Sequence, residues 1–175
     1  MSLADTFQSA HPPDAVLRAY ADEVPAFAAS LPMVAEVVEL AASADDGTLL
    51  RIHRWSADVS RFPRVLTGLL PAHYFQWTTT CRWDRDAREG SWTLNIGVFG
   101  DGEHIEGHHR FVPDGTGTRT EVGGRVLVQA ARYDRIAGIP VPGPLQRTLD
   151  RLIHRVFAEV VARSGEGVER HPHAR

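Results

Sequence analysis

Apolar and polar residues alternate along the middle of the 175-residue chain. Between residues 73 and 83, one set of alternate positions is mostly aromatic or apolar, and the other is mostly Thr, Gln or Arg. Residues 91–98 repeat the pattern, with Trp92, Leu94, Ile96 and Val98 at alternate positions. Because successive side chains of a strand point to opposite faces, both segments are predicted to be β-strands with one apolar face.

Turn signals divide the chain into further strands. Asp45-Asp46-Gly47, Gly100-Asp101-Gly102 and Asp114-Gly115-Thr116-Gly117 are typical of tight turns between antiparallel strands. Gly123-Gly124 lies inside the last predicted strand, where it predicts a β-bulge or bend. The result is an antiparallel meander of about six strands, at residues 33–42, 48–56, 73–83, 91–98, 104–112 and 118–133.

A short strand and two short helices are predicted before this meander. The strand covers residues 3–10 and is stopped by His11-Pro12-Pro13, since proline lacks an amide hydrogen. Helices are expected over residues 14–21 and 24–30, from apolar residues at helical spacing. A further helical segment, residues 58–71, interrupts the meander.

The clearest predicted helix is the last, over residues 144–163, with Pro144 in its first turn. Its apolar stripe includes Leu149, Ile153 and Val156, which we expect to face the concave side of the sheet. The arginines at 147, 151 and 155 are expected to meet water. The tail, residues 164–175, has no periodicity and is predicted to be disordered, which leaves one domain over residues 1–163.

Composition and charge narrow the function classes. The chain is 43% hydrophobic and 23% charged, as in soluble globular proteins, and its net charge is −3, so electrostatics give no reason to expect nucleic-acid binding. All 19 basic residues are arginine, which excludes lysine Schiff-base chemistry and a P-loop lysine. No secretory signal and no membrane-spanning stretch are recognised, so a cytoplasmic location is expected. The single cysteine, Cys81, excludes an intramolecular disulfide and alternates onto the aromatic face, so we expect a buried apolar residue rather than a nucleophile.

The order of these elements resembles the START-like helix-grip superfamily, which holds the polyketide cyclase/dehydrase, lipid-transfer and pollen-allergen families. The resemblance covers residues 3–163 and is carried by three features. His11-Pro12-Pro13-Asp14-Ala15-Val16 follows the first strand, where such proteins open their first helix with a Pro-x-x-x-Val pattern. The insertion Phe62-Pro63-Arg64-Val65-Leu66 and the long final helix also fit. The chain is most similar to the bacterial branches and, more distantly, to PRELI-type phospholipid carriers.

The resemblance implies an α+β fold in which a curved antiparallel sheet of six to seven strands wraps around the C-terminal helix. Members of the superfamily use the space between sheet and helix for sterols, lipids, polyketides or hormones, with no cofactor expected. The residues expected to line such a cavity are Phe75, Trp77, Trp92, Leu94, Ile96, Leu149, Ile153 and Val156. The alternative is that these side chains pack together as a solid core.

The role expected of each polar residue depends on the face of the sheet on which it lies. Arg51 and His53 are candidate polar anchors if their side of the strand points inward, and ordinary surface residues if it points outward. A metal site is considered at His104, Glu106, His108 and His109. His104 and His108 are about 13 Å apart in an extended strand, too far to share one ion, so a solvated outer face accounts for these four residues better than a metal site. No metal site and no catalytic constellation can be recognised by spacing.

Three functions are therefore considered. The first is a non-catalytic carrier or sensor of a small hydrophobic ligand, such as a lipid, an isoprenoid or a polyketide-like molecule. The second is a polyketide cyclase or aromatase in which Arg51 or His53 steers ring closure. The third is a protein-interaction module, against which the Arg- and His-bearing outer faces argue mildly.

Overall fold

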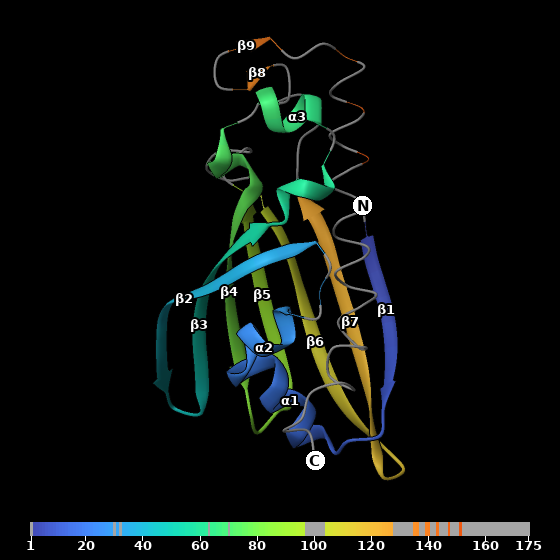
Figure 1. Ribbon diagram of the computed structural model, residues 1–175. Helices are drawn as coiled ribbons and strands as arrows, with labels where there is room; N and C mark the ends of the chain where they lie inside the picture. The colour runs from blue at the N-terminus through green and yellow to red at the C-terminus, as the bar shows by residue number, and fades with distance from the viewer. Residues whose placement is uncertain are drawn as a thin grey trace.

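The computed structural model describes residues 2–29, 31, 33–62, 64–69, 71–96 and 104–127, together with residues 135, 136, 139, 140, 143, 147 and 151. These form a seven-stranded antiparallel sheet with an N-terminal helical pair lying across one face (Figure 1). The strand order is β1-β7-β6-β5-β4-β3-β2. The strands are β1 (Ser2–Ser9), β2 (Val34–Asp45), β3 (Thr48–Ala57), β4 (Gln76–Asp84), β5 (Glu89–Ile96), β6 (His104–Asp114) and β7 (Gly117–Leu127).

The predicted meander is confirmed, and its hairpin from β2 to β3 turns as expected. Asp46 and Gly47 both have positive φ (42° and 81°), the conformation that a tight hairpin turn requires. The first strand joins the sheet at its far edge by pairing with β7. The sheet thus has β1 and β2 as its two edges.

Two short helices, α1 (Pro13–Asp22) and α2 (Val24–Ala28), follow the first strand as predicted. Pro13 occupies the first turn of α1, where the missing amide hydrogen costs nothing. Val16, Leu17 and Tyr20 of α1 are buried in one cluster with Leu49, Trp83 and Phe111 of the sheet. We call the face of the sheet that α1 covers the inner face, and the opposite one the outer face.

The segment between β3 and β4 is helical, as predicted, in three short pieces: η1 (Val59–Arg61), α3 (Arg64–Leu69) and η2 (Ala72–Phe75). The prediction that β4 begins at residue 73 is wrong. A 3₁₀ turn after Pro71 holds residues 72–75, and the amide of Gln76 donates to the carbonyl of His73 before the strand starts.

Of the bulge or bend predicted at Gly123-Gly124, the bulge is wrong, because β7 pairs without a register shift with both β6 and β1 through these glycines. The irregularities lie instead in β2, between Val34 and Glu36 and between Glu39 and Ala41. Bulges are common in edge strands, where they discourage pairing with a further strand.

Two described residues, Arg147 and Arg151, belong to the predicted C-terminal helix, and Gly143 directly precedes its expected start. Gly143, Arg147 and Arg151 are helical and exposed, and Arg151 Nε donates to the carbonyl of Arg147 at 3.1 Å. A spacing of four residues keeps them on one face, so the prediction that Arg147 and Arg151 meet water is confirmed. Leu149, Ile153, Val156 and the tail 164–175 lie outside the described residues. Two short strands, β8 (Arg135–Ile136) and β9 (Ile139–Pro140), pair with each other.

No helix in the described part of the chain is long and apolar enough to span a membrane.

Candidate functional site

The register of the sheet arranges the inner-face side chains in rows that run across the strands. In an antiparallel sheet, directly paired residues point to the same face, so each row can be followed from strand to strand. The first row is Arg51, Cys81, Trp92, Gly107 and Gly124. The second is His53, Thr79, Leu94 and Ile105. The third is Trp55, Trp77 and Ile96.

Four of the predicted cavity residues, Trp77, Trp92, Leu94 and Ile96, therefore share the inner face. Leu94 is buried against Ile105, while Trp77, Trp92 and Ile96 are half-buried and keep part of their surface exposed. Trp77 stacks on Trp55, with ring centroids 6.0 Å apart and planes 10° from parallel. The fifth, Phe75, precedes β4 and meets Phe62 edge-on.

Trp92 lies flat against the sheet because its neighbours in the row are glycines. A Cβ at Gly107 would overlap the indole ring, with Cε2 2.7 Å away, and a Cβ at Gly124 would lie 3.4 Å from Cη2. The ring therefore covers both β6 and β7. Its Nε1 is buried and has no hydrogen-bond partner among the described residues. This role of Gly107 was not predicted from the sequence, although a glycine inside a strand is a signal of close approach by another group.

The strand that carries Arg51 and His53 turns both side chains inward. Arg51 Nη1 donates to Glu39 Oε2 at 2.7 Å, and its Nη2 donates to Asp22 Oδ1 at 3.2 Å. Asp22, the last residue of α1, also accepts from Arg85 Nη2 at 3.0 and 2.8 Å. The two candidate anchors thus lie at one end of the aromatic rows, beside a network of alternating charges.

His53 is buried, with 2% of its surface exposed. Its Nε2 lies 3.6 Å from Glu39 Oε2, and its Nδ1 has no hydrogen-bond partner among the described residues. Burial lowers the pKa of His53; the carboxylate of Glu39 partly opposes this effect and Arg51 adds to it. The neutral imidazole is therefore favoured at neutral pH, with one nitrogen able to donate or accept.

Thr79 and Cys81 lie next to these anchors but offer few polar groups that are available to a ligand. The hydroxyl of Thr79 accepts from Trp55 Nε1 at 2.8 Å. Burial raises the pKa of the Cys81 thiol to about 11, so the thiolate, which is the nucleophilic form, is disfavoured.

His109 was expected on a solvated outer face with His104, Glu106 and His108, and this expectation is wrong for His109 alone. It points inward, between the rings of Tyr20, Trp83 and Phe111, whose centroids lie 4.9 to 6.1 Å from its own. Burial, with a smaller effect from His108, lowers its pKa to about 3. Its inward direction could have been predicted from the sequence. Ile105 and Phe111 are apolar and stand four and two positions away in the same strand, so all three side chains point to the same face.

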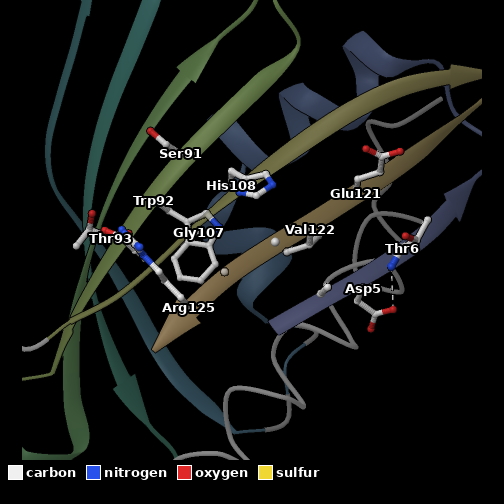
Figure 2. A pocket seen from close by; sticks show the side chains of 14 residues that line it. Asp5, Thr6, Ser91, Trp92, Thr93, Gly107, His108, Glu121, Val122 and Arg125 are labelled. Carbon is white, nitrogen blue, oxygen red and sulfur yellow. Dashed lines mark hydrogen bonds and ion pairs between the residues drawn. The ribbon is translucent and has the colours of Figure 1, made fainter. Parts of the chain in front are cut away.

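The outer face carries a depression of about 1110 Å³ across β1, β7, β6 and β5 (Figure 2). Most of its lining residues occupy the positions between the inner-face ones; they are Ala4, Thr6, Ser91, Thr93, Glu106, His108, Glu121, Gly123 and Arg125. The lining also includes five residues at inner-face positions, which are Asp5, Trp92, Gly107, Val122 and Gly124. Its charges are largely paired with one another. Arg125 Nε donates to Glu106, which also lies 3.3 Å from His104 Nε2. The hydrogen bond from Arg125, with a smaller contribution from His104, lowers the pKa of Glu106.

No group of three or more His, Cys, Asp or Glu side chains suited to a metal ion occurs within the described ranges.

Comparison with known proteins bears on the fold. In sequence, the chain matches no protein-family profile and no curated protein. In structure, it is similar to the Zhui aromatase/cyclase of a Streptomyces species (TM-score 0.67, 20% identity, covering 97% of this chain and 94% of that one). It is also similar to a protein of Thermus thermophilus (0.64, 17%, 96% and 97%) and to a START superfamily protein of Mycobacterium smegmatis (0.55, 17%, 96% and 97%). The chain has the START-like helix-grip fold, an α+β architecture, as the sequence predicted.

Proposed function

We propose that this protein binds a small hydrophobic ligand that carries oxygen atoms, and that the ligand lies on the inner face of the sheet beside Trp77, Trp92 and Ile96. The observation that carries the proposal is the mixture on this face of half-buried apolar surface and buried polar atoms that have no hydrogen-bond partner among the described residues. Burial of aromatic surface supplies binding free energy in proportion to its area, and the polar atoms fix the orientation.

The polar atoms argue for oxygen on the ligand. Trp92 Nε1 is a donor only, and His53 Nδ1 donates or accepts according to its tautomer. A buried polar atom left without a hydrogen bond costs about 1–3 kcal/mol. Both atoms are covered in this structure, so a ligand would have to displace the side chains above them. A hydroxyl or carbonyl group that then reached either atom would remove that cost, whereas a pure hydrocarbon would not.

The names of similar structures support the same class of ligand. One is an aromatase/cyclase, and a di-domain aromatase/cyclase from the steffimycin biosynthetic pathway is also similar (TM-score 0.53, 17% identity). Such names belong to those proteins; for this chain they make a ring-forming or ring-containing ligand a reasonable expectation.

Native mass spectrometry of the purified protein, followed by organic extraction, tests the proposal. We expect a mass above that of the 19.3 kDa chain and a small apolar molecule in the extract. Ile96→Trp fills the half-buried inner position and should reduce the retained ligand. Asn95→Trp places the same ring on the outer face one residue away and should not. A wild-type protein that carries no ligand and takes up none from an apolar extract would overturn the proposal.

A second candidate function is ring closure catalysed within the same site. The buried His53 beside Glu39 and Arg51 favours it, because a neutral imidazole near a carboxylate can move a proton to or from a bound carbonyl compound. The test is conversion of a linear poly-β-ketone thioester to a cyclic product. The double variant Arg51→Met, His53→Asn should abolish that conversion, and retained conversion would exclude these roles.

A further inference from the structure

Arg51 is the one arginine at an inner-face position within the described strands of the seven-stranded sheet. Burial lowers the pKa of both His53 and His109, so neither imidazole adds a positive charge to this face at neutral pH. The attraction that this face exerts on a charged ligand therefore depends on the groups to which Arg51 is bonded.

Two carboxylates hold the guanidinium group of Arg51. Its Nη1 donates to Glu39 Oε2 at 2.7 Å, and its Nη2 donates to Asp22 Oδ1 at 3.2 Å. Glu39 belongs to the edge strand β2, so this contact draws the guanidinium group away from the aromatic residues of β4 and β5. Asp22 also accepts from Arg85, so the two arginines and the two carboxylates together carry no net charge. They offer no net attraction to the anion of a ligand.

The geometry points to Glu39 and Asp22 as specificity-determining residues, which neutralise Arg51 and thereby make the inner-face site bind uncharged ligands and reject ionised acids. This inference rests on the proposed function and narrows its ligand class by charge. A carboxylate that entered the site would lose its hydration, and only pairing with a free cation would offset that cost. Because Arg51 is already paired, an alcohol, ester or amide enters at a lower cost than an ionised acid.

Octanamide and octanoate separate the charge of a ligand from its size and shape. The two probes have the same alkyl chain and a planar head group of similar size, but only octanoate is ionised at neutral pH. We expect equilibrium dialysis with the wild-type protein to show that octanamide binds at least about tenfold more tightly than octanoate. Equal binding of the two probes would overturn the inference.

Glu39→Gln tests the role of the carboxylate, because it removes the negative charge from Arg51 Nη1. Glu39 is 41% exposed at the edge of the sheet, so we expect the variant to fold, which its urea midpoint checks. The affinity for octanoate should rise at least about threefold, while the affinity for octanamide stays within about twofold of the wild type. Addition of Arg51→Met to this variant should remove the gain, because the freed cation is then absent.

The matched control is Glu89→Gln on the outer face. It breaks an ion pair with Arg110 and changes the net charge by the same amount, but far from the proposed ligand site. Both dissociation constants should therefore stay at the wild-type values. An unchanged affinity for octanoate in Glu39→Gln, or an equal gain in Glu89→Gln, would overturn the inference.

Failure of the inference and failure of the proposed function give different results. If neither probe binds, the molecule that the purified protein retains decides the question. An uncharged compound in the organic extract supports the inference, whereas an acid that is ionised at neutral pH overturns it and leaves the binding function standing. If no probe binds and no molecule is retained, both proposals fall.

Discussion

The two faces of this sheet are built by the same strands, yet they differ in how fully their polar groups are paired. On the outer face, charged side chains pair with one another, as Glu89 does with Arg110 at 3.2 Å. On the inner face, His53 Nδ1, Trp92 Nε1 and His109 Nδ1 are buried without partners among the described residues. The proposed ligand site therefore rests on unmet hydrogen-bonding capacity, and not on the number of charges or the size of a depression.

The largest expected difference between the faces is in packing. Phe111 is 2% exposed on the inner face, and the preceding residue, Arg110, is exposed on the outer one. Phe111→Ala should lower the free energy of unfolding by about 3–5 kcal/mol. Arg110→Ala should lower it by less than about 1 kcal/mol, since exposed ion pairs contribute little. Urea unfolding of both variants checks this, and equal losses would show that the inner face is not the packed one.

Glycine-to-alanine substitutions on the two faces make the same comparison with a single added methyl group. Gly107→Ala on the inner face places a methyl group into both Trp92 and the carbonyl of Gly123, and should cost about 1–3 kcal/mol in urea unfolding. Gly123→Ala on the outer face meets the imidazole of His108, which is exposed and able to move. Its cost should stay below about 1 kcal/mol. A larger loss at Gly123 than at Gly107 would contradict the flat placement of Trp92.

The smallest expected effect is a pH dependence that arises from the inner face. The pKa of His109 is lowered from 6.5 to about 3 in the folded protein, so between these values the unfolded chain binds a proton that the folded protein does not. The stability is fully present above pH 6.5 and falls with pH by up to about 1.4 kcal/mol per unit. Urea unfolding at pH 7 and pH 5 measures it.

Replacement of the titrating group isolates this effect. His109→Phe should lose up to about 2 kcal/mol less than the wild type between pH 7 and pH 5. Phe111→Leu loosens the same aromatic cluster without removing a titrating group, and should lower the stability equally at both pH values. If His109→Phe and the wild type respond alike to pH, the imidazole is not desolvated as described.

Alternation predicted the inner face best where the two sides of a strand differ in chemistry. Trp92, Leu94 and Ile96 alternate with Ser91, Thr93 and Asn95, so their placement followed from the residues alone. In β3, alternation alone does not determine which side of the strand faces inward. Leu50 and Ile52 are apolar on the outer side, and the inner side mixes Leu49 and Trp55 with Arg51 and His53. Only pairing with β4, whose Trp77 lies opposite Trp55, determines the direction of these two polar side chains.

Glycines inside strands indicate that some group approaches closely, but the sequence could not predict which one. The answer depends on which side chains the pairing of β5, β6 and β7 brings together. In the sequence of β7 alone, Gly123-Gly124 is typical of a bulge. Within the sheet, the same segment pairs regularly with the two neighbouring strands, β1 and β6. The space that Gly124 leaves on β7 is used by Trp92 of β5, across β6. Such a contact depends on the register of non-local pairs, which a local pattern does not contain.

Asp22 connects α1 to the sheet through ion pairs whose strength depends on the salt concentration. It closes the end of α1 against Arg51 of β3 and Arg85 of the β4–β5 hairpin, and both contacts are partly exposed to water. Added salt screens such pairs over distances of about 8 Å at physiological ionic strength. We therefore expect amide hydrogen exchange to quicken with salt in the last turn of α1 while it stays slow around Val16 and Leu17. The opening rate of this end of α1, and with it the rate of access to the inner face near Arg51, should follow ionic strength.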